Sequence, residues 1–267
     1  MTAGIHFKAE AARSGLIDVL NPSNSSSEGL ELSLLSLSPG QSHAAVTEGL
    51  ESVLVVLAGR CDVVAAGTDW REIGGRANVF SGRAATVYVP AGCEYRVHSD
   101  AGAEVAVIRA PALQSGVPYL IGPEDVEVVV RGRDSHRREV HTILDRGRPA
   151  ASLIVGETFN EAGGWSSYPP HKHDVDDLPR QALLQEVYHF RLDPVQGFGV
   201  QRIYSPERNL DSAYVVENGD SVLIPYGYHP VVAGAGYRLY YLWALAGRGR
   251  DLKMVEDRAH EWISHRA

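Results

Sequence analysis

Several residue types are scarce in this chain of 267 residues. Only 2 cysteines are present, Cys61 and Cys93, which argues against a disulfide framework. No apolar run approaches the length of a membrane span, and residues 1–8 lack the apolar stretch of a secretion signal. We therefore expect a cytoplasmic protein with no membrane partner.

Lysine is scarce as well, with 3 residues against 22 arginines, and the formal net charge is −8. This acidic balance argues against nucleic acid as a partner. Arginine binds carboxylates through a rigid, bidentate fork, so a small anionic substrate is compatible with an acidic protein if an arginine faces the binding pocket.

Helical periodicity is rare, and short apolar runs between turn residues cover most of the chain. This pattern predicts an all-β protein built as a sandwich or barrel. The tail is the exception, because its apolar residues fall near helical spacing and predict a short C-terminal helix over residues 252–265. The expected strands are residues 30–37, 52–57, 61–65, 86–89, 104–110, 126–131, 152–158, 185–192, 198–204, 221–224 and 237–245.

An internal repeat with an offset of 135 residues indicates two similar domains. The Pro-x-Gly turns at residues 90–92 and 225–227 both follow an apolar strand, and Glu51 matches Glu186 at the same offset. The counterpart of His229 is Glu94, and nothing in the first half matches a His-x-His pair. We therefore expect an N-terminal barrel without a metal site, residues 1–135, and a C-terminal metal-binding barrel with the tail, residues 136–267.

Four residues of the second half are spaced to meet at one point. His171 and His173 are two residues apart, so on a strand both would project from the same face. A glycine turn, an apolar strand and a Pro-x-Gly turn lead to His229, and Glu186 opens another apolar strand. Three imidazoles and one carboxylate leave positions open on a six-coordinate ion, which is typical of a catalytic metal rather than a structural one.

The fourth ligand has two candidates. Asp177 lies closer in sequence to the histidine pair, within a run of acids before Pro179, which is more typical of a solvated loop. Glu186 opens an apolar strand and has a counterpart in the repeat. We favour Glu186, and Asp177 stays open as the alternative.

The residues around these histidines resemble known families. Residues 219–229 resemble the second motif of the cupin superfamily, whereas the first motif departs from it because Glu186 follows His173 at a longer spacing. Five segments resemble more narrowly the 5-deoxy-glucuronate isomerases of myo-inositol catabolism, which are related to the 4-deoxy-uronate ketol-isomerases: residues 155–158, 165–174, 196–198, 201–204 and 226–232. The resemblance implies a bicupin, with two tandem antiparallel barrels of jelly-roll type.

The same resemblance implies an aldose–ketose isomerase that converts 5-deoxy-D-glucuronate to 5-dehydro-2-deoxy-D-gluconate. A divalent ion that polarises the carbonyl would support this reaction, and zinc, manganese, nickel and ferrous iron all suit nitrogen and oxygen ligands. Two alternatives remain: a 4-deoxy-uronate ketol-isomerase of pectin-type uronate breakdown, and a cupin dioxygenase that uses ferrous iron. A non-catalytic sugar sensor ranks last, because no DNA-binding pattern is visible.

Strand alternation narrows the residues that could bind a sugar acid. If Glu186 faces the lumen of the barrel, so does Tyr188, while His189 faces away. On the strand expected over residues 237–245 we select Tyr241 as facing the lumen. On the strand expected over residues 198–204 we select Arg202 to bind the substrate carboxylate. No residue is assigned as the catalytic base. A homo-oligomer is compatible with the exposed sheet edges of such barrels.

Overall fold

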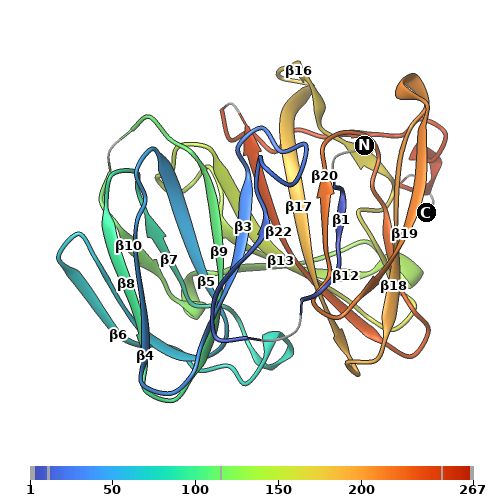
Figure 1. Cartoon of the computed structure of the whole chain (residues 1–267). Helices are drawn as coiled ribbons and strands as arrows, with labels where there is room; N and C mark the ends of the chain where they lie inside the picture. The colour runs from blue at the N-terminus through green and yellow to red at the C-terminus, as the bar shows by residue number, and fades with distance from the viewer. Residues whose placement is uncertain (1–3, 11–12, 115, 248, 265–267) are drawn as a thin grey trace. The chain divides into compact units, whose positions relative to one another are not determined.

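Antiparallel strands make up both halves of the chain in the computed structural model, which describes residues 4–10, 13–114, 116–247 and 249–264 (Figure 1). The all-β prediction is confirmed. In these ranges the only helical segments are 3₁₀ turns, and none has the length and apolar character of a membrane span. They are η1 (Val79–Ser81), η2 (Pro123–Asp125), η3 (Asp134–His136), η4 (Pro206–Arg208) and η5 (Glu261–Ile263).

The N-terminal unit comprises residues 10–127 and 142–155. Its strands pair in the order β10-β7-β5-β9-β3-β2, and the far end of the long β5 also pairs with β6 and β8, which in turn pairs with β4. The strands are β2 (Gly15–Leu20), β3 (Glu31–Leu37), β4 (Gln41–Val46), β5 (Leu50–Ala65), β6 (Thr68–Gly74), β7 (Thr86–Val89), β8 (Glu94–Ser99), β9 (Ala103–Pro111) and β10 (Tyr119–Ile121).

Apolar side chains fill the interior of this unit. Leu54, Val56, Val87, Val105 and Val107 all lie in one buried cluster, with nearly no exposed surface. They come from adjacent strands at two-residue spacing, so their side chains share one face of the sheet. The N-terminal unit is therefore stabilised by apolar burial around its central strands.

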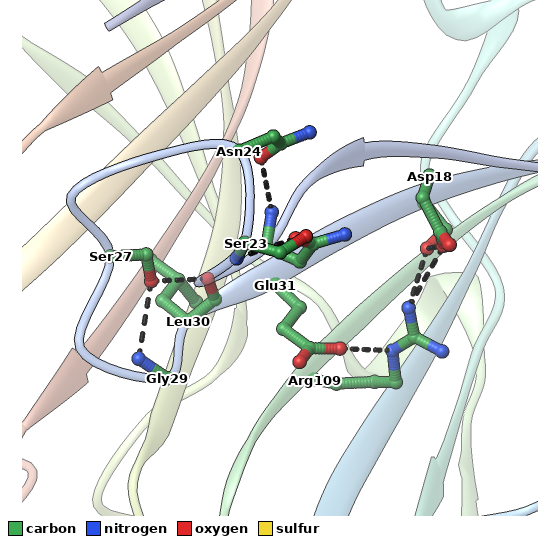
Figure 2. A network of polar contacts seen from close by, with 10 residues as sticks. Asp18, Ser23, Asn24, Ser27, Gly29, Leu30, Glu31 and Arg109 are labelled. Atoms are coloured by element: carbon green, nitrogen blue, oxygen red, sulfur yellow. Dashed lines mark hydrogen bonds and ion pairs between the residues drawn. The ribbon is translucent and has the colours of Figure 1, made fainter. Parts of the chain in front are cut away.

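One arginine of this unit has a structural role on the sheet of β2, β3 and β9 (Figure 2). The guanidinium of Arg109 lies 3.0 Å from the carboxylate of Glu31 and 3.2 Å from that of Asp18, and it donates to Ser33 at 2.7 Å. These contacts join three neighbouring strands. At least some of the many arginines therefore serve the fold rather than a ligand.

The C-terminal unit comprises the chain up to residue 9, residues 128–141, and the chain from residue 156 onward. Its large sheet has the order β1-β20-β17-β22-β13-β12-β11, and a second sheet has the order β14-β21-β18-β19. The strands are β1 (His6–Phe7), β11 (Glu127–Arg131), β12 (Arg138–Leu144), β13 (Leu153–Asn160), β14 (Trp165–Ser166), β15 (His171–Lys172), β16 (Asp174–Asp177), β17 (Gln181–Asp193), β18 (Phe198–Ser205), β19 (Leu210–Glu217), β20 (Ser221–Ile224), β21 (Val231–Ala233), β22 (Arg238–Gly247) and β23 (Val255–Glu256).

Figure 1 shows β20, β17 and β22 of this unit side by side, with β18 and β19 in the facing layer. Leu239 on β22 closes the space between the layers, since a Cβ on Gly199 of β18 would lie 2.4 Å from it. The two sheets thus enclose a lumen onto which alternate residues of β17 and β22 project.

The internal repeat is visible in the strand register. Glu51 on β5 pairs with Ala110 on β9, and Glu186 on β17 pairs with Leu245 on β22. Both partners are offset by the 135 residues expected from the sequence. The two units are therefore built on equivalent central strand pairs.

The compact units do not follow the division expected at residue 135. His6 pairs with Val222, so the N-terminal strand belongs to the C-terminal unit, and residues 142–155 belong to the N-terminal unit. Backbone pairing between distant segments decides this membership, and it leaves little trace in the local sequence.

The predicted C-terminal helix is wrong for the part of the tail that the structure describes. Val255 and Glu256 form β23, which pairs with β15, and only the single turn η5 follows. Met254 and Trp262 keep 40 % and 48 % of their surface exposed. The apolar spacing of the tail therefore does not bury one helical face, and the backbone instead satisfies its hydrogen bonds by strand pairing.

Candidate metal centre

Three separate segments of the C-terminal unit bring polar side chains to one place. The segment of residues 171–173, which begins with β15, carries His171 and His173; β17 carries Glu186, and the turn after β20 ends at His229. His173, Glu186 and His229 are each at least 95 % buried, and each offers a ligand atom within 4.8 Å of the others. This is the only such group found in the described residues.

His171 lies beside this group. Its ring centroid is 4.8 Å from that of His229 and 6.4 Å from that of His173. Burial lowers the pKa of His171 well below its usual value, and the neighbouring His229 and His173 lower it further. His171 is thus a neutral imidazole, the form in which histidine binds a metal.

The hydrogen bonds of two imidazoles leave their inner nitrogens free to coordinate. Nδ1 of His173 lies 2.9 Å from the carbonyl of Leu184, and Nδ1 of His229 lies 2.9 Å from that of Gly227. A carbonyl only accepts, so Nδ1 carries a proton in each ring, and Nε2 is the nitrogen that can coordinate a metal once it carries no proton of its own. This arrangement is typical of histidine ligands, whose outer nitrogen donates to the protein.

The Nε2 atoms of both rings point at a carboxylate. Nε2 of His173 lies 3.0 Å from Oε2 of Glu186, and Nε2 of His229 lies 3.2 Å from the same oxygen. Nε2 of His229 is buried without a hydrogen-bond partner among the described residues. Protons on Nε2 satisfy these contacts as a hydrogen bond from His173 and an ion pair from His229, and when Nε2 is deprotonated in both rings the three groups converge as ligands, so these residues fit a divalent metal.

Glu186 is ionised in this setting. Burial alone would raise its pKa, but hydrogen bonds with His173 and His229 outweigh burial and lower the pKa to about 2. The rival Asp177 lies outside the group, with 42 % of its side chain exposed and an ion pair to Arg180 at 2.5 Å. The geometry favours Glu186 over Asp177 as the carboxylate ligand.

Asp174 connects the segment of residues 171–173 to the turn that carries His229 through hydrogen bonds. Its side chain is buried. The carboxylate accepts hydrogen bonds from the backbone N–H of Gly227 at 3.0 Å and from the side-chain amide of Gln181 at 3.1 Å. Gly227 has φ +92°, and a Cβ there would lie 2.7 Å from the carbonyl oxygen of Tyr204. The turn therefore requires glycine at this position.

Two tyrosines form a wall beside the histidines. Tyr188 and Tyr241 stack with ring centroids 4.2 Å apart, and Tyr188 lies 6.1 Å from the ring of His229. Their hydroxyls bond to Ser167 at 2.7 Å and Ser166 at 3.0 Å. The expected lumen orientation of both tyrosines matches this geometry, and their role in substrate binding stays a prediction.

Arg202 does not reach the lumen. It is exposed, forms a bidentate pair with Asp211 at 2.8 Å for both bonds, and lies 4.1 Å from the ring centroid of Tyr204. Its neighbour Gln201 faces inward instead and donates to the carbonyl of His229 at 2.7 Å. The selection of Arg202 as a carboxylate anchor is therefore wrong, because the opposite face of β18 lines the interior.

Two other basic residues near the histidines face away from the cluster. Nζ of Lys172 lies 3.6 Å from Asp174 and 3.5 Å from Glu207. His189 is fully buried and pairs with Ser221 at 2.9 Å. Both placements agree with the alternation expected from the sequence.

The equivalent carboxylate of the N-terminal unit serves another purpose. Glu51 is fully buried and accepts from the backbone N–H groups of Ala151, Ser152 and Leu153 at 2.6–2.7 Å and from the hydroxyl of Tyr88 at 2.8 Å. Glu94, the counterpart of His229, is exposed. In this unit the glutamate holds a chain segment in place.

The antiparallel barrel of the C-terminal unit, with histidines and a glutamate in its interior, has the architecture of the cupin fold. A crystal structure of oxalate decarboxylase from Lactobacillus farciminis has the same fold, with a TM-score of 0.70 and 14 % identity over 100 % of this chain and 92 % of that one. More narrowly, the chain belongs to the KduI/IolB family, whose model matches residues 5–263.

Relatives of known structure or name cover nearly the whole chain. An IolB-like protein from Salmonella typhimurium LT2 has a TM-score of 0.93 and 35 % identity over 98 % of this chain and 100 % of that one. The 5-deoxy-glucuronate isomerase of Geobacillus kaustophilus is 43 % identical over 228 residues, which are 85 % of this chain and 83 % of that protein. The 5-deoxy-glucuronate isomerase of Bacillus subtilis strain 168 is 38 % identical over 94 % of this chain and 93 % of that protein.

Proposed function

We propose that this chain is a metal-dependent aldose–ketose isomerase that converts 5-deoxy-glucuronate to 5-dehydro-2-deoxy-gluconate. The observation that carries the proposal is its similarity, over most of both chains, to proteins named 5-deoxy-glucuronate isomerase. The buried cluster supplies the chemical reason, because it fits a divalent ion in an enclosed lumen.

His171, His173, Glu186 and His229 would hold the ion. When bound, it would supply a Lewis acid that polarises the sugar carbonyl. Three nitrogens and one oxygen suit zinc, manganese, nickel and ferrous iron alike. The two Nε2–carboxylate contacts, from His173 and His229 to Glu186, would give way to contacts with the cation.

The tyrosine wall would orient the sugar. An aldose becomes a ketose when a hydrogen leaves C2, a hydrogen is added at C1 and the carbonyl moves from C1 to C2, with no net oxidation. A phenol hydroxyl has one proton and two acceptor lone pairs, so a tyrosine that is bonded to a serine could still accept from a substrate hydroxyl, or could exchange its donor bond for one to a substrate oxygen. Tyr188 and Tyr241 are placed for this beside the imidazoles, and their bonds to Ser167 and Ser166 fix the ring positions.

The test is a direct assay by nuclear magnetic resonance with 5-deoxy-glucuronate and no nicotinamide or flavin. Metal-loaded protein should form the ketose, and protein treated with a chelator should not. Exchange of the C2 hydrogen in deuterated water would show proton abstraction. A metal-loaded protein that leaves 5-deoxy-glucuronate unchanged would contradict the proposal.

The same samples distinguish the alternatives. Turnover of a 4-deoxy-uronate instead would indicate the related ketol-isomerases, and oxygen consumption by the ferrous form would indicate a dioxygenase. The place in myo-inositol breakdown, the cytoplasmic location and a homo-oligomer remain predictions.

A further inference from the structure

Arg138 is an arginine near the metal cluster that the sequence did not single out. It opens β12 and is partly buried, and it has no carboxylate partner among the described residues. Nη1 donates to the carbonyls of His136 at 3.1 Å and Tyr168 at 3.0 Å. A guanidinium has five N–H groups, so Nη2 and Nε remain for another acceptor.

Strand alternation places Arg138 on the lumen side of β12. His141 and Glu139 lie on the outer face of β12, since their side chains are 2.6 Å apart and the ring of His141 contacts Phe159 at 4.7 Å. Phe159 in turn contacts Tyr240, which alternates with the lumen-facing Tyr241 on β22. Arg138 differs from His141 by an odd number of residues and so faces the opposite side.

The guanidinium of Arg138 interacts electrostatically with side chains of the proposed site. Burial lowers the pKa of Arg138, while the phenols of Tyr241 and Tyr188 and the more weakly acting carboxylate of Glu256 favour its charged form. Its charge also contributes to the lowered pKa of His171. Its partner Tyr168 lies three residues before His171 on the same segment, so the arginine and the imidazole are joined by a short length of chain.

A partly buried guanidinium that forms no ion pair with a carboxylate among the described residues is available to an anionic ligand. This inference rests on the proposed function, whose substrate carries an aldehyde at C1 and a carboxylate at the other end of the carbon chain. We infer that Arg138 binds the carboxylate of the uronate substrate through Nη2 and Nε, while the reacting end lies at the metal cluster. The bidentate fork fits a planar carboxylate.

The experiment compares Arg138→Gln and Arg138→Lys with Arg202→Gln, whose arginine is exposed and paired with Asp211. Each metal-loaded protein is assayed with 5-deoxy-glucuronate and with 5-deoxy-glucose, which has a hydroxymethyl group in place of the carboxylate. For the uronate we expect kcat/KM to fall by about 100-fold in Arg138→Gln, mainly through KM, with a smaller loss in Arg138→Lys. Turnover of the neutral sugar should change little, and Arg202→Gln should match the parent protein.

Metal content and melting temperature of the variants separate a binding defect from misfolding. Arg138→Lys keeps a donor for the carbonyls of Tyr168 and His136, so it remains informative if Arg138→Gln is unstable. A uronate preference that both folded Arg138 variants retain within threefold would overturn the inference while leaving the isomerase activity standing.

Calorimetry with D-glucuronate tests the anchor apart from turnover. If the parent protein does not isomerise 5-deoxy-glucuronate yet binds D-glucuronate in an Arg138-dependent manner, the proposed function fails and the anchor stands. If the parent protein shows neither turnover nor D-glucuronate binding, the inference is overturned as well.

Discussion

At the scale of single residues, the equivalent glutamates of the two units, Glu51 and Glu186, have different surroundings. Glu186 meets two imidazoles whose Nε2 atoms point at it, whereas Glu51 accepts hydrogen bonds from three consecutive backbone N–H groups. The sequence alone related these glutamates through the repeat. The difference follows from what surrounds each, which is a histidine cluster in one case and a chain segment in the other.

Replacement of Glu186 tests the ligand assignment. In Glu186→Gln we expect metal affinity to fall by more than about 100-fold, because the only carboxylate in the group is lost. Asp177→Asn is the matched control, since Asp177 pairs with Arg180 outside the cluster. Metal titration of both variants checks this, and loss of metal in Asp177→Asn alone would reverse the assignment.

Replacement of Glu51 should affect stability and not metal. Glu51→Gln places an amide donor against backbone N–H groups, so we expect the free energy of unfolding to fall by about 2–4 kcal/mol. Glu94→Gln, at an exposed position, should change it by less than about 0.5 kcal/mol. Denaturant unfolding and elemental analysis check both. Loss of bound metal from folded Glu51→Gln would contradict this view of the N-terminal unit.

Lumen residues could be predicted only where a reference residue was known. Tyr188 was placed correctly because it lies two residues after Glu186 on one strand. Arg202 was misplaced because no residue of β18 fixed which face lines the lumen, and Gln201 faces inward instead. Arg138 was missed because no strand was expected over residues 138–144.

At the scale of elements, each expected strand lies within a strand of the structure except for at most one residue at its start, and several of the missed strands are polar. β4 has no buried residue, and β19 has one. Such strands pair through their backbones at sheet edges, so their sequences lack the apolar run by which a strand is recognised. For the tail, the sequence predicted an element that is absent from the described residues: the apolar residues have helical spacing, but they are not buried on one face and no helix forms.

The pairing of β23 with β15 should support the metal site. Val255 pairs with Lys172, which lies between two candidate ligands. Val255→Pro removes a backbone donor from this ladder, so we expect metal affinity to fall by about tenfold. Val255→Ala keeps the donor and serves as the control. Equal metal affinity in both variants would show that β23 does not position His171 and His173.

The segment that follows the N-terminal strand β1 is bound by pH-dependent contacts with the carboxylate of Asp220. Buried Asp220 accepts from Lys8 at 2.8 Å and from the backbone N–H of Ala9 at 3.0 Å. Burial alone would raise the pKa of Asp220, but the bond with Lys8 and two backbone bonds outweigh it and lower the pKa. The contribution to stability is therefore present above the unfolded pKa of about 3.9 and is lost as pH falls through the folded value.

Asp220→Asn should thus be less stable than the parent protein at pH 7, by about 1–3 kcal/mol, with the difference shrinking below about pH 4. Unfolding curves at several pH values check this. A difference that stays constant down to pH 3 would contradict the role assigned to the ionised carboxylate.

At the scale of the whole molecule, one register describes both central strand pairs, yet only one unit assembles a ligand cluster among the residues described. The sequence lacks counterparts of the C-terminal histidines in its first half, and an N-terminal unit without a metal site stays a prediction. The sequence could not predict which short segments each unit incorporates, because that depends on pairing over long distances.

Metal binding should stabilise the whole protein. A ligand present at about 100 times its Kd adds about 2.7 kcal/mol, which predicts a rise in Tm of about 5–10 °C. His229→Ala should show no such rise. Calorimetric scans with metal and with chelator check this, and an equal shift in the variant would place the stabilising site elsewhere.

The most direct test is a crystal structure of the metal-loaded protein with anomalous diffraction recorded at the absorption edge of the metal. The account predicts one strong anomalous peak within about 2.0–2.2 Å of a nitrogen of His171, His173 and His229 and of a carboxylate oxygen of Glu186. A peak bound by other residues, or no peak in protein that is fully active, would contradict it.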